Sequence, residues 1–243
     1  MKRLERFGVA LVAVFTLGVF AATSASAAEP TKILPEPTVA NPLTSVDKSG
    51  AGTLLTIGGS EVKCTKDTST ASFTTPNLGT FHVLFDGCKA KVPIIGTAPC
   101  TGAVGDVKEQ ILLLGTVHYV LALLTEGTKT KLVAALAFLF EEFHFTCEAL
   151  GQKQLILVKG CAAALAEPVE KLTKITKDVF KEIKSGDSNI LEILMEEATK
   201  EIRCDTLTSV NGGAFELSAQ TGAAENEKFE QGKKAVEVLL MNK

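Results

Sequence analysis

The chain has 243 residues, of which 46% are hydrophobic and 22% are charged, a globular composition that excludes disorder throughout. This length predicts one large domain or two small ones. The formal net charge is −3. Nucleic acids and anionic membrane surfaces both attract basic patches, so this mildly acidic balance argues against either as a partner.

Residues 1–27 have the three parts of a secretory signal. A basic start is followed by an apolar stretch and by the small-residue motif Ala25-Ser26-Ala27. We expect cleavage between Ala27 and Ala28, and therefore an exported protein with no integral membrane segment after cleavage, since a span takes about 20 apolar residues. The signal carries three of the 25 basic and one of the 28 acidic residues, so the remaining chain has a net charge of −5.

The start of the exported chain differs in composition from the rest. Four of the eight prolines lie between Pro30 and Pro42, which predicts a Pro-rich, flexible leader over residues 28–52. Residues 53–243 contain short, β-branched segments separated by glycines. We expect them to form a single strand-rich secreted domain.

Predicted strands follow one another through the middle of the chain. The segment 80–85 is rich in β-forming residues and ends at the turn signal Asp86-Gly87. Further apolar segments, with Gly127 and Gly151 at two of the breaks, lie at 110–124, 131–140, 142–147 and 154–161. This pattern predicts a mainly β fold, an antiparallel β-sandwich or barrel-like domain stapled by disulfides.

The last third of the chain is harder to interpret. Residues 168–204 have apolar residues at a helical spacing, but their Thr and Lys content equally suits an edge strand, so a helix within this range stays open. Gly212-Gly213 predicts a break between two short strands. The polar stretch 221–233 predicts a loop, and 236–238 a last strand.

Three phrases of the sequence carry a resemblance to a known family. They are Gly-Thr-Leu-Leu-Thr-Ile-Gly-Gly-Ser-Glu-Val-Lys-Cys at 52–64, Phe-His-Val-Leu-Phe-Asp-Gly-Cys at 81–88 and Phe-His-Phe-Thr-Cys at 143–147. Over roughly residues 50–180 the chain resembles a family of uncharacterised exported bacterial proteins. The resemblance implies a secreted, strand-rich domain with paired cysteines, and it supplies no catalytic residue.

All six cysteines lie after the predicted signal, which favours disulfides in an exported chain. A zinc site is the alternative, but no Cys-x-x-Cys pair occurs. Cys88 and Cys100 flank a Gly- and Pro-containing loop, and we predict that they pair. The turn near Gly151 places Cys147 opposite about residue 155 rather than Cys161. The remaining predicted bonds are therefore Cys64–Cys147 and Cys161–Cys204.

Each of the three histidines lies in a β-like segment with a threonine two residues away, so the two share a strand face. The opposite face of these segments carries mainly aromatic and β-branched residues. If the strands are neighbours, His82, His118 and His144 could converge as a zinc site. The other interpretation is that each histidine simply lies on the polar face of a half-buried strand.

Several signatures of enzymes are missing from the sequence. It contains no Gly-x-Ser-x-Gly elbow, no His-Glu-x-x-His helix and no phosphate-binding glycine loop, and we predict no cofactor. With one Tyr and no Trp, a carbohydrate-binding surface is disfavoured. We expect a non-enzymatic structural or binding protein of the cell envelope or extracellular space. The alternative is a secreted metal binder or metal-dependent hydrolase that uses the three histidines.

Overall fold

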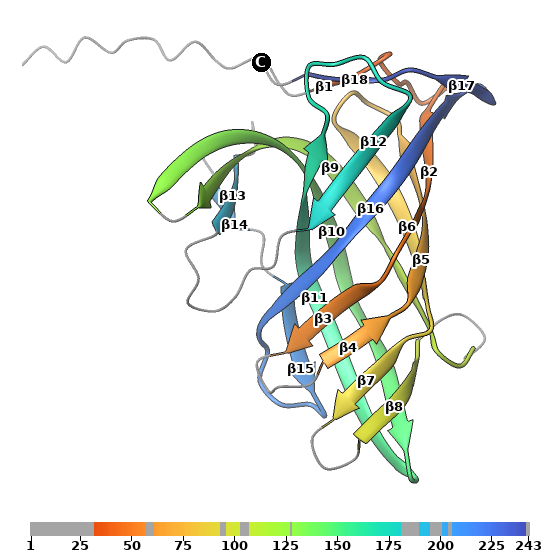
Figure 1. Ribbon diagram of the computed structural model, residues 1–243, viewed down its shortest axis with the longest axis vertical. Helices are drawn as coiled ribbons and strands as arrows, with labels where there is room; N and C mark the ends of the chain where they lie inside the picture. The colour runs from red at the N-terminus through yellow and green to blue at the C-terminus, as the bar shows by residue number, and fades with distance from the viewer. Residues whose placement is uncertain are drawn as a thin grey trace, which may run out of the picture.

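A computed structural model describes residues 32–56, 61–92, 96–102, 107–126, 128–180, 190–194, 201–203 and 206–241. These residues form β-strands and no helix, and the strand pairings are antiparallel, which confirms the predicted fold class. The predicted signal and its cleavage site at Ala27 and Ala28 lie outside the described residues. The molecule is elongated, and long strands run obliquely along its length (Figure 1).

The strands in chain order within the described residues are β1 (Lys32–Leu34), β2 (Leu43–Ser49), β3 (Gly52–Thr56), β4 (Glu61–Cys64), β5 (Lys66–Phe73), β6 (Leu78–Asp86), β7 (Lys89–Val92), β8 (Gly96–Thr101), β9 (Gln110–Glu126), β10 (Lys129–Ala149), β11 (Gln152–Glu167), β12 (Ile175–Phe180), β13 (Ile190–Leu194), β14 (Glu201–Arg203), β15 (Thr206–Val210), β16 (Glu216–Gln231), β17 (Lys234–Val236) and β18 (Leu239–Met241). Their hydrogen-bonded pairings define the architecture.

The longest strands pair in a circuit. The pairing follows the order β16, β2, β5, β6, β9, β10, β11 and β12. The last of these, β12, pairs back with the first, β16. Strands β3, β4, β7 and β8 connect β16 with β10 near one end of the molecule, and β1 and β18 pair at the other end (Figure 1). The sheet thus wraps around one interior, where the main hydrophobic core lies.

One part of the sheet extends away from this interior. The far end of β9 and the start of β10 curve outward together, and β13 and β14 continue from β9 (Figure 1). A second, smaller cluster of buried residues, which includes Ala135, Ala137 and Ala163, packs along β9–β11. The described chain therefore has a main core and a satellite core.

The β10–β11 hairpin has the turn that the sequence predicts. Leu150 and Gly151 both have positive φ, at 53° and 74°, and Ala149 pairs with Gln152, so the loop has two residues. Two successive positive φ angles are typical of the type I′ turn, which suits the twist of a hairpin. Cys147 pairs with Gln154, one residue from the predicted position.

Two expectations for polar segments are wrong, and the choice between helix and strand that was open for residues 168–204 is decided. The predicted leader instead contributes β1 and β2, and Leu43 of β2 is fully buried between β16 and β5. The predicted loop at 221–233 is mostly part of β16. The described residues within 168–204 contain strands β12, β13 and β14 and no helix. In the first two cases pairing with distant strands satisfies a backbone whose own sequence has few apolar residues.

Four cysteines form a row across neighbouring strands. Cys64 follows Lys63, which pairs with Lys89, and Cys88 precedes Lys89, so the two cysteines face each other. Cys147 pairs directly with Cys100, whose amide donates a hydrogen bond to the Cys88 carbonyl (2.9 Å). The bonds are Cys64–Cys88 and Cys100–Cys147, so the predicted pairs Cys88–Cys100 and Cys64–Cys147 are wrong.

The geometry of the row explains this correction. Cys88 and Cys100 are neighbours, as predicted, but each also has a second neighbour. A Cys88–Cys100 bond would leave Cys64 and Cys147 three strands apart, about 14 Å, where a disulfide needs Cα atoms within about 7 Å. All four cysteines are bonded only when each outer cysteine of the row pairs with its inner neighbour. Cys161 is also disulfide-bonded, and Cys204, its predicted partner, lies outside the described residues.

Candidate ligand-binding cavity

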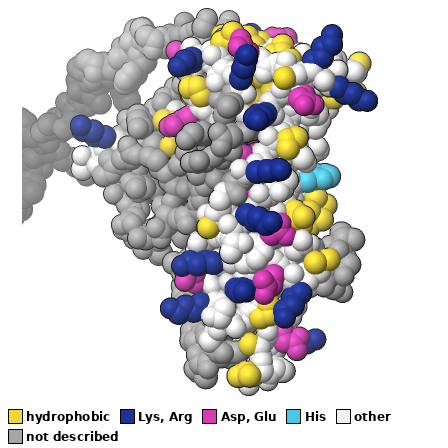
Figure 2. All heavy atoms as spheres, turned by 45° about the vertical axis from the view of Figure 1, so that its right-hand side comes forward, with side chains coloured by type: hydrophobic (Ala, Val, Ile, Leu, Met, Phe, Trp, Pro, Cys, Tyr) yellow, Lys and Arg dark blue, Asp and Glu magenta, His cyan; other side chains and the backbone are white. Residues whose placement is uncertain are grey.

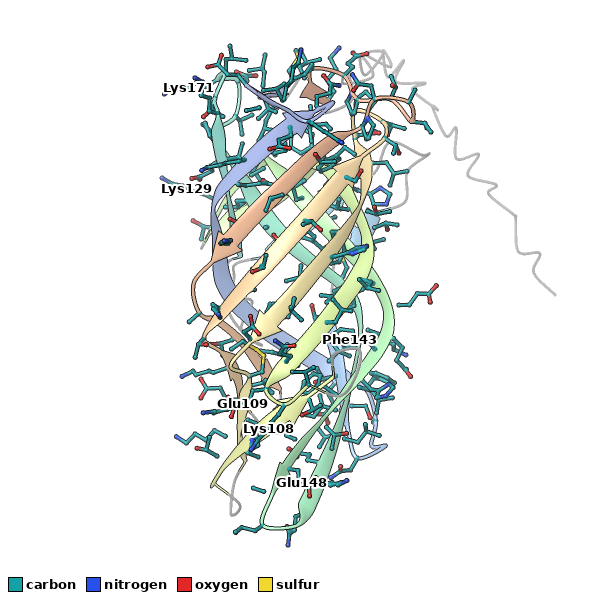
Figure 3. All side chains as sticks on the ribbon, turned by 90° about the vertical axis from the view of Figure 1, so that its right-hand side faces the viewer. Lys108, Glu109, Lys129, Phe143, Glu148 and Lys171 are labelled. Carbon is teal, nitrogen blue, oxygen red and sulfur yellow. A yellow bond between two sulfur atoms is a disulfide. The ribbon has the colours of Figure 1, made fainter. Side chains whose placement is uncertain are left out.

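The interior of the sheet contains a cavity of about 180 Å³. Its lining is mainly apolar and comes from strands β3–β6, β9–β11, β15 and β16. The phenylalanines of the lining are Phe73, Phe81, Phe85, Phe138, Phe140, Phe143 and Phe145. Figure 3 shows the labelled Phe143 in the half of the molecule that also carries Glu109 and Glu148, far from Lys171. A concave apolar space with a few polar groups is the usual form of a small-molecule site.

Alternation along the strands directs these side chains inward. On β6, Phe81, Val83 and Phe85 line the cavity, whereas His82 between them is exposed. The same period of two places Leu113 of β9 on the lining, opposite Val83 in the strand register. The aromatic and β-branched face that the sequence indicates is therefore the inner face of the sheet.

A β-bulge in β10 lets one strand contribute two groups of aromatic residues. The β10–β11 register shifts between Phe140 and Phe143. Before the shift the even-numbered Phe138 and Phe140 face the cavity, and after it the odd-numbered Phe143 and Phe145 do. The residues between them, 141 and 142, are exposed glutamates. The bulge thus unites two segments that the sequence predicts as separate strands.

The aromatic rings contact one another at their edges. Phe81 of β6 and Phe138 of β10 pack edge-to-face with ring centroids 5.1 Å apart. Phe140 and Phe143 pack in the same way at 5.7 Å. Edge-to-face pairs at these distances are favourable because the positive ring edge meets the negative ring face. The rings thereby give the cavity an aromatic, polarisable wall.

One acidic side chain in the lining is buried. Glu227 of β16 is 5% exposed, and its Oε2 accepts a hydrogen bond from the Thr176 hydroxyl at 2.7 Å. The Ser45 side chain also hydrogen-bonds to this carboxyl group. Burial raises the pKa of Glu227, and the two hydroxyl hydrogen bonds offset part of that rise. Glu227 is therefore a buried proton-binding group at the wall of an apolar space.

One further acidic residue lies opposite Glu227, and another belongs to the cavity lining. The β2–β16 register pairs Val46 with Lys228, which brings the buried Asp47 opposite Glu227. Asp67 of β5 lies in the cavity lining and is partly buried. No lysine, arginine or histidine belongs to the described lining. The ionisable character of the cavity is thus acidic.

The predicted histidine site does not form. His82 pairs with Leu114 and His118 with Leu78, so the two histidines are four residues apart along neighbouring strands, about 13 Å of strand rise. His144 lies on β10 beyond the bulge. His82 and His144 are exposed on the outer face, and partial burial lowers the pKa of His118. The described residues contain no group of three His, Cys, Asp or Glu side chains able to hold a metal ion.

The outer surface differs from the interior. Figure 2 shows Lys and Arg side chains interleaved with Asp and Glu over one face of the molecule, with a histidine among them. This mixture of signs is typical of a solvated protein surface.

Glu227 could not be found by sequence reasoning, because its segment is predicted as a loop. Within β16 the buried Glu227 and Phe229 alternate with the exposed Lys228 and Glu230, but a single apolar residue is too weak a pattern to indicate a strand. The phenylalanines are different. Their spacing of two at 143/145, and the Phe-Val-Phe pattern ending at 85, already indicated one apolar face.

Comparison of the chain with family models, with curated proteins and with solved structures finds no match. The described residues include no helix that could cross a membrane. Disulfides persist in oxidising, extracytoplasmic environments, and the two bonds between described cysteines indicate such an environment for this chain.

Proposed function

We propose that this protein is an exported, non-enzymatic binding protein that holds a small apolar molecule in its interior cavity. The observation that carries the proposal is the cavity of about 180 Å³ with its wall of phenylalanines. An engineered apolar cavity of about 150 Å³ binds benzene, so this space suits a molecule of one ring or a short chain. The cell envelope and the extracellular space are the proposed locations.

Export is supported by two independent features. Residues 1–27 have the pattern of a secretory signal, and the disulfides require an oxidising compartment. The resemblance of residues 50–180 to exported bacterial proteins agrees with both. N-terminal sequencing of the protein after export tests this part, and a mature chain that does not begin at Ala28 would contradict it.

Binding is tested by filling the cavity. Leu113 of β9 lines it, whereas the adjacent Leu114 is 50% exposed on the outer face. We expect Leu113→Phe to weaken binding of an apolar probe such as benzyl alcohol by about tenfold or more, because the larger side chain occupies the space. Leu114→Phe is the matched control and should bind like the unmodified chain. The proposal would be refuted if calorimetry gave the same affinity for the probe in both variants.

A further inference from the structure

The ionisable groups of the cavity restrict the kind of molecule that it can hold. Among the described lining residues, Asp67 and Glu227 are the ones that can carry a charge, and both are acids. The carboxyl side chains that are buried among the described residues are those of Asp47 and Glu227, and no described lysine, arginine or histidine is buried. A ligand that carries a carboxylate would therefore be desolvated beside like charge, with no basic side chain of the lining to pair with.

We propose that the cavity selects an apolar amine: one ring or a short chain with a single amino group, which is bound as an ammonium ion paired with Glu227. This inference rests on the proposed function, since it names the chemical class of molecule for the same cavity. The inference excludes fatty acids and aromatic acids as ligands of this cavity, although their apolar parts would suit it.

The hydrogen bonding of Glu227 leaves room for such a partner. A carboxylate has two oxygens and about four acceptor positions. The hydroxyl groups of Ser45 and Thr176 donate to this carboxyl, which leaves acceptor capacity for an ammonium N–H. An ammonium ion also removes the cost of an isolated buried carboxylate, because the two charges compensate each other. A charge-assisted hydrogen bond is about twice as strong as a neutral one.

The phenylalanine wall favours the same chemistry. The negative face of an aromatic ring attracts a cation, and this attraction increases when the site is desolvated. Rings such as Phe81 and Phe138 line the same cavity as Glu227, so the cavity offers a cation both a carboxylate and polarisable rings. A ligand alcohol could donate a hydrogen bond to the same carboxyl group, but it would bring no positive charge to compensate the buried carboxylate. The size of the cavity suits a molecule of about eight non-hydrogen atoms.

Three probes of nearly equal size test the inference: benzylamine, benzyl alcohol and benzoate. Their binding to the exported chain is measured at pH 7 by calorimetry. We expect benzylamine to bind about tenfold or more tightly than benzyl alcohol, and benzoate to bind most weakly. Binding of benzoate as tight as that of benzylamine overturns the inference, and the proposed function survives as long as benzyl alcohol binds. If none of the three binds, both fail.

Substitution of Glu227 assigns the selectivity to one residue. Glu227→Gln keeps the size and one oxygen acceptor but removes the charge. We expect it to weaken benzylamine binding about 10- to 100-fold and benzyl alcohol binding by less, so that the preference for benzylamine over benzyl alcohol falls. Glu230→Gln is the matched control, since Glu230 is exposed on the same strand. An unchanged ratio of the two affinities in Glu227→Gln overturns the inference, and the ranking of the three probes on the unsubstituted chain tests it without any variant.

Discussion

The cysteine row makes a prediction in which loop length determines the magnitude. The Cys100–Cys147 bond joins residues 47 apart, and the Cys64–Cys88 bond joins residues 24 apart. In the chain-entropy model, bonds with these separations stabilise a protein by about 4 and about 3.5 kcal/mol. Replacing both cysteines of one bond by alanine should therefore lower the melting temperature by about 7–16 °C in a chain of this size.

A third variant separates this connectivity from the alternative. Cys88→Ala with Cys100→Ala removes one partner from each bond and should cost about 7.5 kcal/mol, the sum of both effects. It should also expose two new thiols, those of Cys64 and Cys147. A Cys88–Cys100 bond would instead give a loss of about 3 kcal/mol and no new thiol from that bond.

The assays are thermal unfolding and thiol counting under denaturing, non-reducing conditions. The two variants that each lose a whole bond should show no thiols beyond those of the unsubstituted chain. The predicted connectivity would be refuted if peptide mapping found Cys88 joined to Cys100. It would also be refuted if the Cys88→Ala, Cys100→Ala variant showed no new thiols. The thiol count is decisive even where a variant aggregates on heating.

Three further predictions concern single residues. Gly115→Ala should destabilise by about 1–3 kcal/mol in chemical denaturation, because its Cβ would overlap the carbonyl oxygen of Leu139; a loss below 0.5 kcal/mol would contradict this. Burial raises the pKa of Glu227, so its contribution to stability is present below its unfolded-state value of 4.5 and is lost as pH rises through the folded value. Glu227→Gln should therefore gain stability relative to the unsubstituted chain as pH rises from 4 to 8, and a pH-independent difference between the two denaturation midpoints would refute the assignment. Asn211→Ala should cost about 1 kcal/mol, since its Oδ1 accepts a hydrogen bond from the Leu155 amide at 2.9 Å and its φ is 51°; unchanged hydrogen exchange at that amide would count against it.

The parts of the fold that could be predicted from the sequence are those whose signal is local. The period of two in the segment 80–85 and the glycine of the β10–β11 turn are properties of neighbouring residues, and the strands and the hairpin form there. The inward face of Phe81, Phe143 and Phe145 follows from the same alternation. The lining of the cavity was thus present in the sequence as an apolar face, although nothing indicated that the face encloses a space.

The remaining features depend on residues far apart in the chain. Strand β2 pairs with β16, so that Ser45 lies opposite Phe229. These residues are so far apart in the chain that no local sequence pattern indicates their pairing. Each strand alone is polar enough to resemble a linker. Burial of Glu227 depends on the same pairing, because the hydroxyl groups that hydrogen-bond to it come from β2 and β12. The cysteine pairing failed for a related reason: it depends on the order of four strands.

The cysteine row also affects how the chain matures. In the unfolded chain Cys88 and Cys100 are only twelve residues apart, so closing that loop costs about 0.6 kcal/mol less entropy than closing Cys64–Cys88, and less again than Cys100–Cys147. The bond that forms most readily is therefore one that blocks both final bonds. Its rearrangement requires attack by a thiolate, either that of Cys64 or Cys147 or that of an isomerase or a small thiol. We expect efficient maturation only where thiol–disulfide isomerisation accompanies oxidation, and a compartment that oxidises without isomerising would accumulate trapped chains.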